Sequence, residues 1–306
     1  MAKVILVGCG NVGMAFAYAL ATSTSSVREL VLIDTNHAKA EGDALDLGHA
    51  AVYNSSPIKV RAGGYSECDN ADIICICAGA NQLPGQTRAD LVNTNYKIMH
   101  SIVSNVAKTK FRGIYVVATN PVDVMTFFVQ KLSGFAHKRV VGSGTTLDTA
   151  RLRFLVGEEL GIHPRGVHAY VLGEHGDTAF IPWSLAYVGI SKIDMYLNDD
   201  KRARILWDVR NSAYDIINKK GSTYYGIGIC LRDLVVAILE DQKVIRTVSC
   251  YDKQSDTYFG MPAVLSKGGA TLTKCLEFNQ QERDALAKSI DAIKKIIYTV
   301  DATIHR

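Results

Sequence analysis

The segment VLGEHGDTAF, residues 171–180, holds one histidine between two glycines. The ordinary pKa of a histidine lies near neutrality, so the imidazole of His175 can donate or accept a proton at physiological pH. Gly173 and Gly176 leave room beside it for a small molecule. A histidine that merely caps a turn fits the same pattern, so other residues must decide between a structural and a chemical role.

Asp148 and Arg151 stand three residues apart in LDTARLRF, which places them on one face of a helix. As a surface ion pair they would contribute at most about 1 kcal/mol to stability. In a site, Asp148 would orient His175 and stabilise its protonated form, while Arg151 would bind a substrate carboxylate through two parallel hydrogen bonds. This set predicts proton transfer on a small carboxylic acid.

Another candidate cation, Arg88, ends the stretch NQLPGQTR, residues 81–88. Pro84 and Gly85 predict an exposed loop here. Loops of this kind can close over a site, exclude water and bring a cation to a reacting carbonyl group. We therefore expect Arg88 to polarise the substrate.

A glycine motif, Gly8-x-Gly10-x-x-Gly13, follows the first apolar run and opens the first helical pattern. Gly8 permits the sharp turn, Gly10 lets backbone amides approach a pyrophosphate, and Gly13 lets helix and strand pack closely. Asp34 ends the second apolar run, where a carboxylate can bind ribose hydroxyls and repel a 2′-phosphate. The alternative is a set of turn glycines with a strand-end aspartate and no ligand. We predict NAD, and with it hydride transfer.

Short apolar runs alternate with helical patterns in the first half of the chain. The runs cover residues 3–8, 29–34, 71–79, 113–121 and 139–144. Near-continuous apolar character indicates strands buried on both faces, as in a parallel sheet. Helical patterns such as NVGMAFAYALATS and VNTNYKIMHSIVSNVAK fill the gaps. The prediction is an α/β fold with a Rossmann-type doubly wound parallel sheet, whose ligand lies beyond the carboxyl ends of the strands.

The pattern changes after about residue 143. Longer helices dominate there, among them LDTARLRFLVGEELG and a final helix QQERDALAKSIDAIKKIIYTVDA, with strand-like pieces in between. We predict an NAD-binding domain over residues 1–142 and a smaller α+β substrate domain over residues 143–306.

Composition argues against several other classes of protein. Lysine and arginine exceed the acidic residues by only four, 34 against 30, and they are scattered, so nucleic acid is not an expected partner. The apolar run at the N-terminus is too short for a membrane span. Seven cysteines, an odd number, occur without a C-x-x-C pair, so we expect a cytoplasmic protein without a metal site.

Seven segments together resemble the successive motifs of bacterial L-lactate dehydrogenases, within the lactate/malate dehydrogenase family. They span nearly the whole chain: GCGNVG, LIDTN, CAGANQLPGQTR, ATNPVDV, GSGTTLDTARLRF, VHAYVLGEHGDT and KKGSTYYGIG. The resemblance implies the catalytic roles argued above for His175, Asp148, Arg151 and Arg88. It implies substrate-binding roles for Gln82, Arg88, Asn120, Arg151 and Thr223. It implies cofactor contacts at Gly8, Gly10, Asn11, Val12, Gly13, Asp34, Gly79, Ala80, Asn120 and Ile227.

The substrate depends on Gln82. In the family this position is arginine where the substrate has a second carboxylate and glutamine in lactate enzymes. A neutral side chain would leave a buried second carboxylate without a counter-charge, so pyruvate and L-lactate are favoured over malate. Larger 2-oxo acids, as in an L-2-hydroxyisocaproate dehydrogenase, are the alternative. A redox sensor that binds NAD without turnover is a further one, but a sensor needs no such catalytic set.

The resemblance also implies regulation and assembly. Arg153 and His168 match positions that bind fructose 1,6-bisphosphate between subunits in allosteric bacterial members; two unrelated cations are the alternative interpretation. The family suggests a homotetramer, or a dimer of dimers governed by the effector.

Gln82→Arg is expected to shift substrate preference toward oxaloacetate, because it supplies a charge for the second carboxylate. The measurement is kcat/KM for pyruvate and for oxaloacetate in the wild type and the variant. An unchanged ratio of the two constants would contradict the assignment of Gln82 to the substrate pocket.

Overall fold

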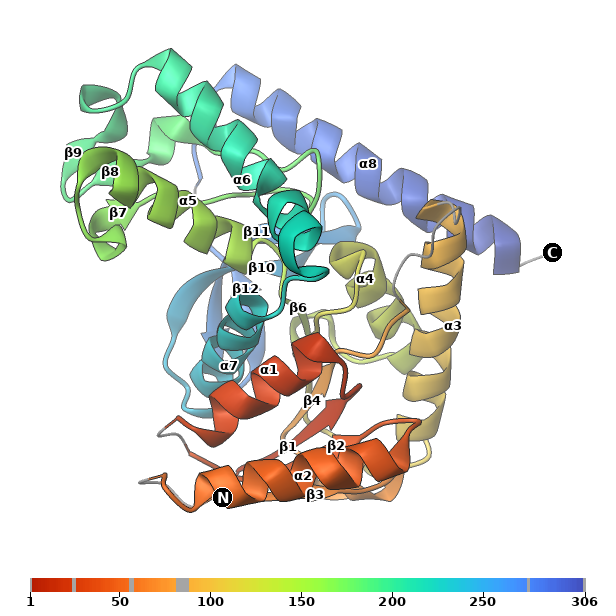
Figure 1. Ribbon diagram of the computed structural model, residues 1–306. Helices are drawn as coiled ribbons and strands as arrows, with labels where there is room; N and C mark the ends of the chain where they lie inside the picture. The colour runs from red at the N-terminus through yellow and green to blue at the C-terminus, as the bar shows by residue number, and fades with distance from the viewer. Residues whose placement is uncertain (1, 24–25, 55–57, 81–87, 274–275, 305–306) are drawn as a thin grey trace.

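The computed structural model describes residues 2–23, 26–54, 58–80, 88–273 and 276–304, without the side chains of residues 88–89 and 301–304. Its centre is one sheet with helices packed on both faces (Figure 1). The strands of this sheet are β1 (Ala2–Val7), β2 (Val27–Ile33), β3 (Lys59–Ala62), β4 (Ile73–Ile76), β5 (Ile114–Val117), β6 (Val140–Gly142), β10 (Val244–Asp252), β11 (Thr257–Ser266) and β12 (Gly269–Leu272).

The strand order is β12-β11-β10-β6-β5-β4-β1-β2-β3. From β1 the chain winds outward through β2 and β3 and then, in the other direction, through β4, β5 and β6, and these six strands are parallel. This arrangement confirms the predicted Rossmann-type doubly wound sheet. The order reverses between β1 and β4, and doubly wound sheets bind their ligands at the carboxyl ends of the strands beside such a reversal.

Alternating residues of the strands divide the core into two layers. Val4 and Leu6 of β1 face one layer, whereas Ile5 and Val7 face the other. The first layer packs against α1 (Asn11–Ala21), α2 (His37–Ala51) and α7 (Tyr225–Leu239). The second packs against α3 (Arg88–Val106), α4 (Val122–Ser133) and α8 (Gln280–Ile304). Burial on both faces explains why the strands are apolar at nearly every position.

Strand β3 is absent from the predicted elements. Its sequence, KVRA, alternates charged with apolar residues, and it lies at the edge of the sheet. An edge strand has only one neighbour and carries charge that discourages further pairing, so a search for apolar runs misses it.

The second half of the chain is built onto the same sheet. Strands β10, β11 and β12 are antiparallel and extend it beyond β6. Leu231 and Leu234 of α7 belong to the same buried cluster as Leu6 and Phe16. The two halves therefore share a core.

Above this shared core lies a smaller layer, at the upper left of Figure 1. It contains α5 (Thr146–Leu160), α6 (Asp199–Lys220) and a three-stranded sheet of β7 (Val167–His168), β8 (Tyr187–Val188) and β9 (Ser191–Lys192). Short 3₁₀ turns cover Tyr65–Asn70, His137–Arg139, Pro164–Gly166, Trp183–Leu185 and Ile193–Met195. Within the described ranges, no helix is both long and apolar enough to cross a membrane.

Candidate active site

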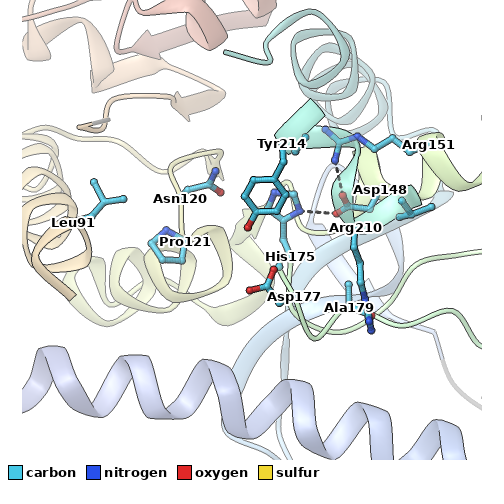
Figure 2. A pocket seen from close by; sticks show the side chains of 13 residues that line it. Leu91, Asn120, Pro121, Asp148, Arg151, His175, Asp177, Ala179, Arg210 and Tyr214 are labelled. Atoms are coloured by element: carbon cyan, nitrogen blue, oxygen red, sulfur yellow. Dashed lines mark hydrogen bonds and ion pairs between the residues drawn. The ribbon is translucent and has the colours of Figure 1, made fainter. Parts of the chain in front are cut away.

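A cavity of about 310 Å³ lies where five segments of the chain meet. Its walls come from α3, the start of α4, the start of α5 with the loop at residues 171–180, and α6. Figure 2 shows Leu91, Asn120 and Pro121 on one side of it, with His175, Asp148 and Tyr214 on the other. The lining residues are Leu91, Asn120, Pro121, Asp148, Arg151, His175, Gly176, Asp177, Ala179, Val209, Arg210, Ala213 and Tyr214.

Asp148 connects His175 to Arg151. The Nδ1 atom of His175 lies 2.6 Å from Asp148 Oδ2, and Arg151 Nη1 donates a hydrogen bond to Asp148 Oδ1 at 2.8 Å. An ionised carboxylate can only accept hydrogen bonds, so the proton of the neutral imidazole is on Nδ1. The atom left for proton exchange is therefore Nε2.

The electrostatics of this group favour a charged His175. Burial would raise the pKa of Asp148, but the charges of His175 and Arg151 lower it below its usual value. In turn, the charge of Asp148 raises the pKa of His175, against the opposing effect of burial. The position of Asp148 in the first turn of α5 also places its charge at the positive end of the helix dipole.

The two glycines beside His175 have different roles. Gly176 lines the cavity, as expected for a residue that leaves room for a small molecule. Gly173 has a φ of +89°, and a Cβ there would lie 2.3 Å from Ser289 Oγ. The expectation that Gly173 clears space for a ligand is wrong, because this glycine serves the backbone turn and the close contact with α8.

The other residues predicted to contact the substrate, and Ile227, predicted to contact the cofactor, do not all line this cavity. Asn120 lines the cavity. Thr223 precedes α7, and Ile227 on α7 packs against the core; neither lines this cavity. Gln82 lies outside the described residues. Arg88 is the first residue of α3, and Leu91, one turn later on that helix, borders the cavity.

The glycine motif forms the turn that a dinucleotide requires. Gly8 has a φ of +100° and a Cβ there would lie 2.4 Å from Ala78 N. A Cβ on Gly13 would lie 2.0 Å from Gly8 O, whereas one on Gly10 would meet nothing within 4 Å. Packing within the chain therefore explains Gly8 and Gly13 but not Gly10. Open space at Gly10, before the N-terminus of α1, fits a pyrophosphate group.

The segments that follow β1 and β2 continue this edge with polar groups. Asp34 accepts hydrogen bonds from the backbone amides of Cys9, at 2.7 Å, and Asn36, at 2.9 Å. Burial would raise the pKa of Asp34, but these hydrogen bonds keep that pKa below its usual value. A carboxylate accepts about four hydrogen bonds, so Asp34 retains capacity for ribose hydroxyls. Next to the motif, Asn11 Nδ2 donates to Ser222 Oγ at 3.1 Å, and Val12 packs against the core.

Asn95 was not predicted from the sequence, yet it connects two of the predicted loops. Its Oδ1 accepts a hydrogen bond from Ala80 N at 2.8 Å, and its Nδ2 donates to Asn120 O at 2.7 Å. Nearby, a Cβ on Gly79 would lie 2.7 Å from Thr119 Cγ2. An asparagine within a helical pattern carries no signal of such a contact.

Helix α6 also contributes to the cavity, which was not predicted from the sequence. Arg210 and Tyr214 are four residues apart on that helix, and both line it. The Arg210 guanidinium donates to Ala179 O through Nε at 3.0 Å and Nη2 at 2.5 Å, which ties α6 to the loop that carries His175. Their spacing on one helix face is the only signal in the sequence.

Arg153, on α5, contacts the backbone of the residue that follows His168. Arg153 Nε donates to Ala169 O at 3.1 Å, and its guanidinium stacks over Tyr170 with 4.9 Å to the ring centre. Arg153 lines a second cavity, of about 380 Å³, together with Arg165, Arg232 and Arg246. His168 is exposed on β7 and does not line it.

Nearly the whole chain matches known dehydrogenases. Residues 2–142 match the lactate/malate dehydrogenase NAD binding domain, and residues 145–304 match the alpha/beta C-terminal domain of that family. The L-lactate dehydrogenase of Halalkalibacterium halodurans is 44% identical, over 96% of each chain. That of Geobacillus stearothermophilus is 43% identical, over 97% of this chain and 96% of its own.

Solved structures agree. The minor L-lactate dehydrogenase of Enterococcus mundtii in its ligands-bound form superposes with a TM-score of 0.94 at 40% identity, over 98% of both chains. A lactate dehydrogenase from a Medee basin deep-sea metagenome library has a TM-score of 0.95 at 39% identity, over 98% of this chain and 99% of its own. The cofactor of the first domain is NAD. The chain belongs to the lactate/malate dehydrogenase family.

Proposed function

We propose that this chain is an L-lactate dehydrogenase that interconverts pyruvate and L-lactate with NAD. The observation that carries the proposal is the group of His175, Asp148 and Arg151 in one cavity. The relatives named above, which carry that activity in their names, support it. Residues 1–142 would bind the cofactor and residues 143–306 would supply most of the catalytic groups.

The geometry of the described residues supports the roles proposed for His175, Asp148 and Arg151, and the family resemblance supports those of Asn120 and Arg88. In pyruvate reduction His175 Nε2 donates a proton to the carbonyl oxygen, and in lactate oxidation it takes that proton back. Asp148 holds the ring and stabilises the imidazolium. Arg151, which already binds Asp148 through Nη1, offers its other nitrogens to the substrate carboxylate. Asn120 would bind the substrate oxygen, and Arg88 would polarise the carbonyl group.

The cofactor site would use the open edge at the glycine motif. Gly8, Gly10 and Gly13 would hold the pyrophosphate at the start of α1, and Asp34 would bind the adenosine ribose. Bound NAD supplies the exchange of a hydride with the substrate carbon. Asn95 would hold the loops at Ala80 and Asn120 in a fixed position relative to each other.

We propose a monocarboxylate such as pyruvate over oxaloacetate on the basis of Gln82. An L-2-hydroxyisocaproate type of enzyme, which acts on larger 2-oxo acids, is the alternative. We also propose that Arg153 and His168 bind fructose 1,6-bisphosphate in a homotetramer. Arg165 and Arg232, which line the cavity at Arg153, support an anion site, whereas Arg246 in the same cavity is already paired with Asp233. Exposed apolar side chains support subunit contacts: Tyr18 on α1, Trp207 and Ile217 on α6, and Tyr225 and Ile229 on α7.

His175→Asn is expected to lower kcat for pyruvate by roughly 10² to 10⁴-fold, because it removes the acid/base group. NADH binding, followed by fluorescence, should be retained. The assay is NADH oxidation with pyruvate, 2-oxoisocaproate and oxaloacetate. The exposed His49 gives a matched control, His49→Asn, which should keep wild-type rates. Turnover at the wild-type rate in His175→Asn would refute the proposal.

Asp148→Asn is expected to move the pH dependence of pyruvate reduction. The protonated His175 is the reactive form in this direction, so activity is lost as pH rises through the raised pKa of His175. Without the charge of Asp148 that pKa falls, and the loss should begin at lower pH. The profile of kcat/KM against pH measures this, with Asp194→Asn, at an exposed ion pair, as control. An unshifted profile would show that Asp148 does not act on His175.

Fructose 1,6-bisphosphate is expected to lower the apparent KM for pyruvate, and Arg153→Ala should abolish the effect. Sedimentation with and without the sugar bisphosphate tests whether it also favours the tetramer. Arg204→Ala, which removes an arginine paired with Glu159 on the surface, is the control. Identical saturation curves for the wild type with and without the effector would exclude the site.

A further inference from the structure

A second carboxylate lies behind His175. Asp123, in the first turn of α4, is 2% exposed. Its Oδ2 accepts a hydrogen bond from the backbone amide of His175 at 2.8 Å. Its Oδ1 is buried without a hydrogen-bond partner among the described residues. Asp148 thus contacts the ring of His175, and Asp123 contacts its backbone.

A buried carboxylate with one unpaired oxygen is costly, so its surroundings matter. The titratable groups that face Asp123 are His175 and Glu174 from the loop at residues 171–180, and Cys250 from β10. The hydroxyl of Ser249, also on β10, lies close enough to lower the pKa of Asp123 but forms no regular hydrogen bond. The one of these groups that can carry a positive charge is His175.

The charges of Asp123 and His175 therefore depend on each other. Burial raises the pKa of Asp123 to about 6, even though the Ser249 hydroxyl, the His175 amide and the positive charge of His175 each act to lower it. Asp123 in turn adds to the effect of Asp148 in raising the pKa of His175, while Arg151 opposes both. A neutral residue of the same shape could accept the amide hydrogen bond equally well. A carboxylate is needed only if its charge matters.

We propose that Asp123 is a positioning residue for proton transfer, which fixes the backbone of His175 and places a second negative charge at its amide. The loop has another anchor for comparison. Ser289 on α8 accepts a hydrogen bond from the amide of Glu174 at 3.1 Å and donates to Thr178 O at 2.7 Å. This anchor carries no charge, so it separates the effect of holding the loop from the effect of charge.

The test compares Asp123→Asn with Ser289→Ala. Diethyl pyrocarbonate modifies neutral imidazole, so the rate of modification of His175 against pH, followed peptide by peptide by mass spectrometry, reports its pKa without any need for turnover. In Asp123→Asn the midpoint is expected to fall by roughly one pH unit. In Ser289→Ala it should stay at the wild-type value. Equal midpoints in wild type and Asp123→Asn would overturn the proposal.

Kinetics add a second readout. In Asp123→Asn kcat for pyruvate should fall by roughly tenfold, with little change in KM because Arg151 is untouched, and the alkaline loss of kcat/KM should move to lower pH. A fall in kcat with an unshifted profile would mean that Asp123 only holds the loop, against the proposal. If Asp123→Asn does not fold, Asp123→Ser also removes the charge, retains an oxygen acceptor and is judged by the same midpoint.

The inference rests on the proposed acid/base role of His175, but the two can fail separately. Wild-type turnover in His175→Asn would remove the proposed function, whatever the modification experiment gives. An unshifted modification midpoint in Asp123→Asn would remove only the role of Asp123.

Discussion

The arrangement of this protein depends on keeping a carboxylate ionised away from water. Asp148 is 6% exposed, and an isolated charge in such a place would take up a proton or unfold the region around it. It stays ionised because an imidazole and a guanidinium bind its two oxygens. Those partners come from a distant loop and from the next turn of α5, so the electrostatic requirement determines how loop and helix must pack.

That packing is supported from several directions. Ser289 of α8 and Asp123 of α4 bind the amides of Glu174 and His175, and Arg210 of α6 binds the carbonyl of Ala179. The loop with the imidazole is thus held at its backbone by three helices. Rigid support of this kind keeps a proton-transferring group in position without help from the substrate.

Much of the fold and part of the site could be predicted from the sequence. The apolar runs and the glycine motif are patterns of residues close together in the chain. Such patterns predict strands, turns and helix starts directly. Asp148 and Arg151 share a helix turn, so their proximity is also local. Their proximity to His175 is not local. It was expected only on chemical grounds, because a carboxylate can orient an imidazole and stabilise its protonated form.

The rest depends on contacts between segments far apart in the chain. Asn95 bridges Ala80 and Asn120. At Gly173 a side chain would collide with Ser289 on the last helix. No spacing in the sequence reports either contact. The continuation of the sheet by β10 is equally hidden, since a strand pattern does not specify its neighbour.

That continuation limits how the molecule can move. Gly142 of β6 pairs with Ser249 of β10 inside one sheet. The helices α1, α2 and α7 contribute side chains to a single buried cluster against that sheet. A hinge motion that separates the two halves is therefore excluded, because it would break the hydrogen bonds between β6 and β10 and expose the buried cluster to water. Any change in access to His175 must therefore leave this sheet and this cluster intact.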